Sequence, residues 1–129
     1  MKKGFLVLTG LVMFTFTSCS NQNEEELKKL ESELMAGHDV VMPKTMKLLD
    51  MKEEIISKIG EKDSATVAKV ASELQVANDE MYAWMDEYQV VMNEVQDEKE
   101  KVKRFAILKA KIDSIQVITE KAMNDAKSL

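Results

Sequence analysis

Apolar residues recur at steps of three and four along most of this chain, and that spacing constrains its fold more than any other feature. The pattern covers residues 24–59, then residues 64–95, and then the stretch from Val102 to Met123. Steps of three and four keep side chains on one face of an α-helix. The sequence therefore predicts three amphipathic helices. The stripe of the first consists of Leu27, Leu30, Leu34, Met35, Val41, Met42, Leu48, Leu49, Ile55 and Ile56.

The segments between these stripes are short and contain residues that end or begin helices. Gly60 is a natural stop for the first helix, and Asp63 or Ser64 is a natural cap for the second. The stripe lapses again over residues 96–101, which we interpret as a turn or kink. The chain has 5% aromatic residues, four glycines and one proline, a composition that favours helices over sheets. Residues 24–129 are therefore predicted to form an all-α domain, an elongated, antiparallel, coiled-coil-like bundle of three helices running up, down and up.

Pro43 lies in the middle of the first stripe. A proline inside a helix removes one backbone hydrogen bond and clashes with the carbonyl four residues earlier, here that of Asp39. Either the first helix kinks near Pro43, or two helices meet there. Because the stripe continues in phase on both sides, a kink is the preferred interpretation.

The first eighteen residues have a different pattern. Two lysines supply a positive start, residues 4–16 carry no charge, and small residues lead to Cys19, the only cysteine in the chain. Such an apolar run is too short to span a bilayer but matches the core of a secretion signal. The stretch "FTSC", residues 16–19, resembles the lipobox of bacterial lipoproteins. The resemblance implies that residues 1–18 are a signal peptide and that the chain is cut before Cys19.

The same resemblance implies a lipid anchor on Cys19. Its thiol would receive a diacylglycerol and its new amine an acyl chain such as palmitate, so it could form no disulfide and bind no metal. Two or more acyl chains hold a protein stably on a membrane, whereas one holds it only marginally. We therefore expect a cell-envelope protein attached to the outer membrane, on its periplasmic or its surface face. An ordinary secretion signal with a stray thiol is the other interpretation.

Charge narrows the range of partners. The chain carries 18 basic and 23 acidic residues, and loss of Lys2 and Lys3 with the leader leaves a net charge of −7. A negatively charged protein is a poor partner for nucleic acids and anionic lipids, so the anchor alone is expected to attach it to the membrane. A protein partner or a homo-oligomer stays open, because a wide, methionine-rich stripe can accept another helix.

Residues 19–23 are predicted to comprise the lipidated cysteine and a short polar tether. An acidic triplet, Glu24, Glu25 and Glu26, follows them. The triplet has two interpretations. Acidic residues stabilise the start of a helix by interacting with its dipole. The triplet also resembles the surface-export signal of some Bacteroidota lipoproteins.

The chemically unusual side chains gather near the proline. His38, the only histidine, shares a helical face with Met35, Met42 and Met46. One face of the second helix carries Met81, Trp84 and Met85. If the first turn is centred near residue 62, Met42 lies level with Tyr82. The two groups are therefore expected to meet in the middle of the bundle.

Two interpretations of this cluster are open. In the first it is core: methionine fills the gaps that a kink creates, the Trp84 N–H needs an acceptor, and His38 bonds a backbone carbonyl freed by Pro43. In the second it is a soft-metal site, because thioethers and imidazole suit Cu(I) and an indole face attracts cations. The candidate ligands are His38, Met42, Met46, Met81 and Met85, with Trp84 as a cation–π partner or core residue. A haem held by His and Met from facing helices is a further variant, although no Cys-x-x-Cys-His motif is present.

Two motifs carry a family resemblance. The sequences "HDVVMP" at residues 38–43 and "DEMYAWM" at residues 79–85 resemble those of small helical lipoproteins from Bacteroidota. These proteins often carry the automatic label "viral A-type inclusion protein". The similarity covers the chain from about Leu34 to its C-terminus. It implies a helical lipoprotein but no activity, because the family has no established one.

Catalysis is not predicted. The sequence has no Ser–His–Asp arrangement, glycine-rich phosphate loop or His-rich cluster, and di-iron bundles need histidines on two helices. We predict a lipid-anchored, non-enzymatic protein of the cell envelope that binds a partner or has a structural role and requires no cofactor. The alternative is a copper-binding envelope lipoprotein that uses the His/Met/Trp cluster.

Overall fold

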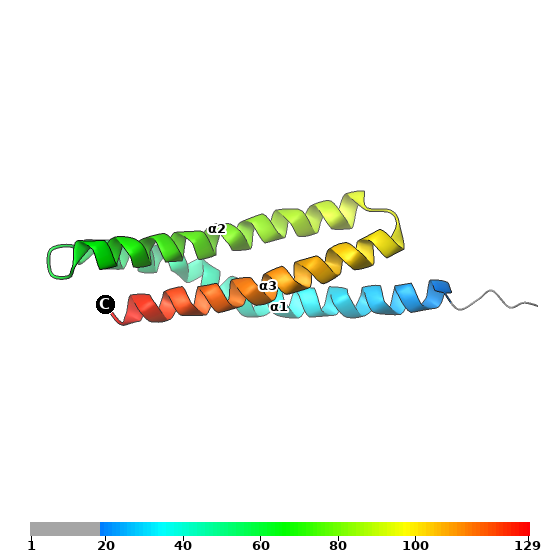
Figure 1. Ribbon diagram of the computed structural model, residues 1–129, viewed down its shortest axis with the longest axis horizontal. Coiled ribbons are helices and arrows are strands. Elements are labelled where there is room, and N and C mark those ends of the chain that lie inside the picture. Colours follow the sequence, from blue (N-terminus) through cyan, green and yellow to red (C-terminus); the bar gives the residue numbers. More distant parts are fainter. Residues whose placement is uncertain (1–18) are drawn as a thin grey trace, which may run out of the picture.

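The computed structural model describes residues 19–129, and the predicted signal peptide, residues 1–18, lies outside them. Three helices form: α1 spans Cys19–Ser57, α2 spans Ser64–Glu94 and α3 spans Glu98–Lys127. Figure 1 shows them side by side in an elongated rod, with α1 and α3 running in one direction and α2 in the other. The predicted all-α, up-down-up bundle is confirmed. Within the described residues, no helix is both long enough and apolar enough to cross a membrane.

The first connection uses local chemistry that ends one helix and begins the next. Gly60, which follows the end of α1, has a φ of +108°, a conformation that other residues adopt only at a cost. Asp63 then caps α2, since its carboxylate accepts a hydrogen bond from the Thr66 N–H at 2.8 Å. Of the two predicted caps, Asp63 and Ser64, Asp63 is the one that forms, and Gly60, the predicted stop, lies three residues after the end of α1.

The second connection is shorter than predicted. Only residues 95–97 separate α2 from α3, whereas we expected residues 96–101 to form a turn or kink. Asp97 is the reason, because its carboxylate accepts a hydrogen bond from the Glu100 N–H at 2.8 Å and so caps α3. Glu98 and Glu100 lie in the first turn of α3, where the helix dipole favours negative charge.

α1 begins earlier than predicted. Residues 19–23, which we expected to be a polar tether, belong to this helix, and no acidic residue occupies its first turn. The interpretation of Glu24, Glu25 and Glu26 as the start of the helix is therefore wrong, because α1 begins five residues before Glu24. No glycine or proline interrupts the segment, so the helix extends backwards beyond its apolar stripe. An ion pair between Lys28 Nζ and Glu24 Oε1, 2.6 Å apart, joins positions one turn apart there.

α1 passes through Pro43 as one continuous helix. Figure 1 shows that the helix changes direction about midway along its length. Loss of one backbone hydrogen bond and the clash of the proline ring with the preceding turn are the usual causes of such a bend. The prediction of one helix, rather than of two helices that meet at Pro43, is confirmed.

The core follows a seven-residue repeat. In α1 the buried apolar residues are Leu34, Val41, Leu48 and Ile55. In α3 two such rows are buried, formed by Phe105, Ile112, Thr119 and Ala126 and by Leu108, Ile115 and Ala122. This is the narrow seam of a coiled coil, in which two positions of every seven face the other helices. Leu49 and Ile56, which we predicted to be buried, are 44% and 41% exposed because they lie one position beyond the seam.

The core has two clusters of different side-chain size. The cluster that includes Trp84 and Phe105 contains the buried aromatic residues and lies toward the α2–α3 turn. The other cluster lies toward the α1–α2 turn, and four of its nine buried residues are alanines: Ala71, Ala77, Ala122 and Ala126. Each helix also buries one polar side chain, namely Thr45, Asn78 and Thr119. Aromatic side chains therefore fill one end of the bundle, whereas the other end combines alanines with aliphatic residues such as Leu48 and Leu74.

Thr119 is the weak point of this core. Its side chain is fully buried, and its hydroxyl has no hydrogen-bond partner among the described residues. We expect Thr119→Val to raise the free energy of unfolding by about 1 kcal/mol, because burying an unpaired hydroxyl is costly. Thr45→Val is the matched control, since Thr45 Oγ1 donates to the Val41 carbonyl oxygen at 3.1 Å. Chemical denaturation compares the two variants, and equal effects would contradict the prediction.

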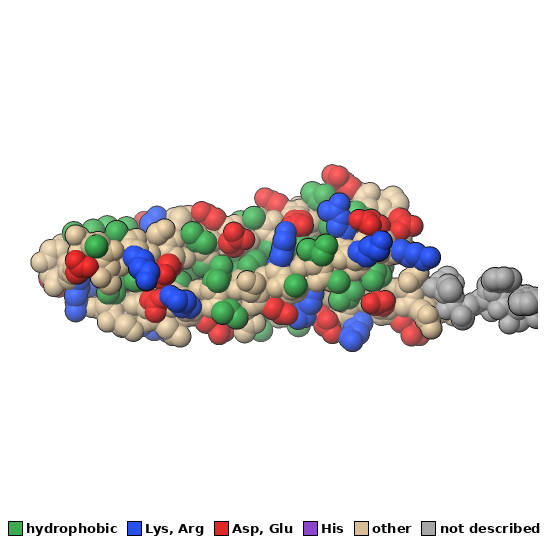
Figure 2. Space-filling model, viewed as in Figure 1, with side chains coloured by type: hydrophobic (Ala, Val, Ile, Leu, Met, Phe, Trp, Pro, Cys, Tyr) green, Lys and Arg blue, Asp and Glu red, His purple; other side chains and the backbone are tan. Residues whose placement is uncertain are grey.

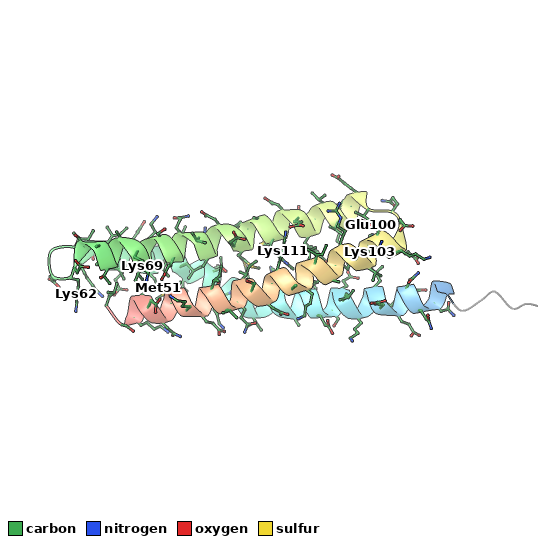
Figure 3. All side chains as sticks on the ribbon, in the orientation of Figure 1. Met51, Lys62, Lys69, Glu100, Lys103 and Lys111 are labelled. Carbon is green, nitrogen blue, oxygen red and sulfur yellow. The ribbon has the colours of Figure 1, made fainter. Side chains whose placement is uncertain are left out.

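Ion pairs join α3 to both other helices. The pairs are Lys44–Glu120, between α1 and α3, and Lys111–Glu87 and Lys121–Glu73, between α3 and α2. Figure 2 shows acidic and basic side chains interspersed along one face of the rod, and Figure 3 places Lys111 between α2 and α3. All these side chains are partly exposed, so each pair contributes little to stability. Within residues 19–129, no ion pair joins α1 to α2.

Candidate functional site

Part of the predicted cluster surrounds a hollow between α1 and α2. Its volume is about 220 Å³, and it is lined by Met35, His38, Trp84, Met85, Tyr88 and Gln89. Met35 and His38 lie one turn apart on α1, so their side chains point to the same side of that helix. The predicted register brought the middle of α1 beside the Trp84 segment of α2. The stacking of His38 on Trp84 confirms it.

Four rings stack beside this hollow. Ring centroids lie 6.4 Å apart for His38 and Trp84, 5.6 Å apart for Trp84 and Tyr88, and 5.7 Å apart for Tyr88 and Phe105. The planes of successive rings are inclined by 30°, 13° and 14°. Such separations are favourable for offset aromatic pairs. The stack links all three helices, because its rings come from α1, α2 and α3.

Trp84 is held rigidly in this stack. Its side chain is only 2% exposed, and its Nε1 donates a hydrogen bond to the carbonyl oxygen of Leu108 in α3 at 2.9 Å. The acceptor that the indole N–H needed is therefore the backbone of a neighbouring helix. A ring fixed in this way forms a firm wall of the hollow.

His38 is partly exposed and bonded to its sequence neighbour. Its Nδ1 lies 3.2 Å from Oδ1 of Asp39, and the side chains of the two residues are 29% and 79% exposed. The prediction that this ring bonds to a backbone carbonyl is therefore wrong, because its partner is the Asp39 carboxylate. An exposed aspartate side chain can bend back to the ring, although adjacent helix positions point about 100° apart. An imidazole whose Nδ1 is held by a carboxylate presents Nε2 to a ligand.

Tyr88 contributes a neutral phenol to the hollow. Burial raises the pKa of this phenol, and the negative charge of Glu31 raises it further. Both effects disfavour the phenolate. At physiological pH the residue therefore supplies an aromatic wall and an uncharged hydroxyl.

The structure brings together only part of the predicted ligand set. His38 and Met85 line the hollow, and Met42 packs, partly buried, against the same core cluster. Met81 is fully buried in that cluster, whereas Met46 is 70% exposed. Met46 lies two turns beyond His38, and at this spacing the helix has rotated its side chain out of the seam.

Three residues of the hollow were absent from the predicted ligand set: Met35, Tyr88 and Gln89. Met35 was placed on the same face as His38, and Tyr88 lies four positions after Trp84, so the helical period was the signal that could have identified both. Gln89 lies outside the apolar stripe. Nothing in the sequence pattern distinguishes it from other exposed polar residues.

The donors around the hollow are soft. Two thioethers, one imidazole and one indole line it, and within residues 19–129 no group of three or more His, Cys, Asp or Glu side chains is arranged to hold a metal ion. Thioether sulfur and imidazole nitrogen bind soft ions such as Cu(I), whereas hard divalent cations require several oxygen ligands. The arrangement is therefore suited to a soft cation or to an apolar side chain.

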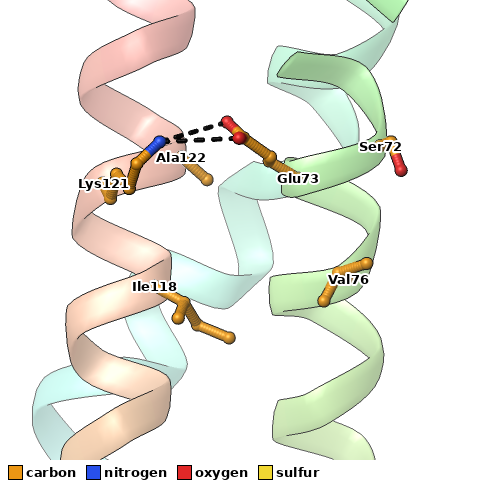
Figure 4. A pocket seen from close by; sticks show the side chains of 6 residues that line it. All are labelled: Ser72, Glu73, Val76, Ile118, Lys121 and Ala122. Carbon is orange, nitrogen blue, oxygen red and sulfur yellow. Dashed lines mark hydrogen bonds and ion pairs between the residues drawn. The ribbon is translucent and has the colours of Figure 1, made fainter. Parts of the chain in front are cut away.

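A second hollow of about 220 Å³ lies between α2 and α3. It is lined by Ser72, Glu73, Val76, Ile118, Lys121 and Ala122, and Figure 4 shows Glu73 and Lys121 facing each other across it. Both carboxylate oxygens of Glu73 lie 3.5 Å from Lys121 Nζ. The small side chain of Ala122 leaves part of the space between the helices unfilled. Its polar groups already satisfy each other, so the hollow around His38 is the stronger candidate site.

Neither a known protein family, nor a curated protein, nor a solved structure matches this chain.

Proposed function

We propose that this protein is a lipid-anchored, non-enzymatic component of the cell envelope that acts by binding a partner or as a structural element. One observation carries the proposal: a lipobox-like stretch ends at Cys19, and Cys19 is also the first residue of α1. Acyl chains on this residue would attach the bundle to a membrane without an intervening flexible linker. The resemblance of residues 38–43 and 79–85 to helical Bacteroidota lipoproteins supports the same role.

The position of the anchor would orient the rod. α1 begins at the end of the bundle that carries the α2–α3 turn, and the α1–α2 turn and the C-terminus lie at the opposite end (Figure 1). With 39 residues at about 1.5 Å each, α1 is about 58 Å long. A rod held by one end would present its long faces to partners beside the membrane.

The anchor is tested by replacing Cys19. We expect Cys19→Ser to abolish acylation, so that protein from which the leader has been removed appears in the soluble fraction, because no other feature of residues 19–129 is expected to attach it. Ser20→Ala is the matched control and should leave the protein on the membrane. Mass spectrometry of protein from its native host should show an acylated N-terminal cysteine. An unmodified thiol or an uncut leader would overturn the proposal.

Soft-metal binding is the second candidate function. Met35, His38 and Met85 line the same hollow as Trp84, and this observation favours Cu(I) over any harder ion. In this proposal His38, Met35 and Met85 would hold the ion, with Trp84 beside it. Of the other residues predicted from the sequence, Met42 and Met81 support the site from the core. Met46 has no part in it.

Titration with Cu(I) against a competing chelator tests this candidate, with Trp84 fluorescence as the signal. The expected result is quenching that saturates at one equivalent and is lost in His38→Ala and in Met85→Ala. Met46→Ala is the matched control and should behave as the parent protein. Because an ion that binds only the folded state must raise Tm, an unchanged Tm in excess Cu(I) would contradict copper binding.

A further inference from the structure

The surface between α1 and α2 carries a second apolar row. Each buried residue of the α1 seam is followed directly by another apolar residue, which gives Met35, Met42, Leu49 and Ile56 at a spacing of seven. The first two are partly buried, and the last two are 44% and 41% exposed. Seven residues correspond to about 10.5 Å along a helix. The row therefore forms an apolar wall with the repeat that a further helix would need.

The facing wall comes from α2. Gln75, Tyr82 and Gln89 recur there at the same spacing, and Tyr82 is 47% exposed. Two observations place this row against α1: Lys52 Nζ donates to Gln75 Oε1 at 2.8 Å, and Gln89 lines the hollow that also contains Met35. We call the surface between the two rows the α1–α2 groove. The hollow around His38 forms part of it.

The rim of the α1–α2 groove is acidic. The positions just outside the two walls, again spaced by seven, are Ser32, Asp39, Met46 and Glu53 on α1 and Asp79, Asp86 and Asn93 on α2. Four of these seven residues are acidic and exposed, and none is basic. Within the described residues, Glu53, Asp79 and Asp86 form no ion pair, and Asp39 contacts only the His38 ring.

The two other grooves of the bundle differ in charge. α1 carries five basic and nine acidic residues, α2 one and six, and α3 eight and five. The basic helix α3 thus lies against two acidic helices, and ion pairs close both of its grooves. No ion pair closes the α1–α2 groove, although the hydrogen bond from Lys52 to Gln75 spans it. The groove combines the apolar row of α1 with rim carboxylates that form no ion pair with a lysine or arginine.

We infer that the α1–α2 groove binds a basic amphipathic helix of a partner protein. Apolar residues of the partner at heptad spacing would contact Met42, Leu49 and Tyr82, and its flanking lysines or arginines would meet the four rim carboxylates. A second copy of this chain fits less well. Its own α1–α2 groove carries the same charge, and the Lys111 and Lys121 side chains of its α3 already pair with α2. The inference rests on the proposed function as a binding protein and names the surface and the partner class.

The test can use residues 20–129. Both core clusters and the hydrophobic residues packed against them lie between Leu27 and Leu129, so this domain keeps every contact of the core. The probe is a labelled peptide of about 21 residues, three heptads long, with leucine at the a and d positions and lysine at the e and g positions. A second peptide has glutamate in place of lysine. Fluorescence anisotropy measures binding of each at about 0.15 M salt.

We expect the lysine peptide to bind and the glutamate peptide not to bind. The variant Asp79→Asn/Asp86→Asn should weaken binding about tenfold, whereas Glu80→Gln/Glu94→Gln, with the same change of charge elsewhere on α2, should have little effect. Leu49→Ser/Ile56→Ser should also weaken binding about tenfold. Val40→Ser/Val90→Ser is the control for that variant, because these side chains are similarly exposed, at 45% and 46%, and lie outside the groove.

Two results would overturn the inference. Equal affinity for all variants would show charge attraction without a site. A dimer of residues 20–129 that only Leu49→Ser/Ile56→Ser dissociates would show that a second copy fills the groove. Cellular fractionation of Cys19→Ser measures the anchor independently of the groove. A failure of the proposed location and a failure of the docking surface are therefore distinguished.

Discussion

Replacing Trp84 by alanine is expected to lower the free energy of unfolding by about 3–5 kcal/mol. The indole is 2% exposed, it stacks on His38 and Tyr88, and its N–H donates to the Leu108 carbonyl. The substitution would therefore remove a large buried surface, break the aromatic stack and leave a cavity where three helices meet. Chemical denaturation followed by circular dichroism measures the change.

Two further variants separate the contributions of Trp84. Trp84→Phe keeps a ring in the stack but loses the hydrogen bond, so we expect a smaller loss of about 1–2 kcal/mol. Tyr82→Ala removes an aromatic side chain that is 47% exposed two positions away, and we expect a loss below about 1 kcal/mol. If Trp84→Ala cost no more than Tyr82→Ala, the stack would not be part of the stabilising core.

The second large effect is expected at Gly37. A Cβ atom at this position would lie 3.0 Å from both Cγ1 and Cγ2 of Ile112, which shows how closely α1 approaches α3 there. We expect Gly37→Leu to lower the free energy of unfolding by about 3 kcal/mol or more, because its side chain would force the helices apart. Gly37→Ala should cost less, since the gain in helix propensity of about 1 kcal/mol offsets part of the overlap.

Matched variants test this explanation. Ala36 is exposed on the neighbouring position of α1, so Ala36→Leu should change stability by less than about 0.5 kcal/mol. Ile112→Ala makes room opposite the glycine. The double variant Gly37→Leu/Ile112→Ala should therefore lose less stability than the sum of the two single changes. Additive losses would show that the close approach of the two helices is not the cause.

The number and direction of the helices could be predicted because their causes are local. The apolar stripes follow the helical period, and Gly60 and Asp63 end and begin helices through contacts with residues a few positions away. The same reasoning failed at residues 19–23 and 96–101. In both places the absence of an apolar stripe suggested a loop, but helix continuation or the cap at Asp97 decided the outcome.

The width of the buried face could not be predicted from the same pattern. Leu48 and Leu49 are adjacent residues of the same type, yet the first is fully buried and the second is 44% exposed. The difference arises because only two other helices pack against α1, and their contacts cover a narrow seam. Leu49 and Ile56, the exposed residues of the second apolar row on α1, line the α1–α2 groove.

The candidate site shows the same division. The level of His38 relative to Trp84 followed from the length of the helices and the position of the turn between them. The same reasoning could not tell which methionines lie beside His38, because Met35 and Met46 are the same residue type and both share a helical face with His38. The packing of α2 against one side of α1 placed Met35 in the hollow and left Met46 in solvent.

Three helices that run up, down and up, and the level at which His38 meets Trp84, followed from the amino-acid sequence alone. These properties depend on the helical period of the apolar residues and on local caps, which involve only residues close together in the sequence. Packing of the three helices, in contrast, determines which members of each stripe are covered, which side chains line the hollow and which groove lacks ion pairs. These features depend on how the surfaces of α1, α2 and α3 fit together, because a residue is buried only where another helix covers it.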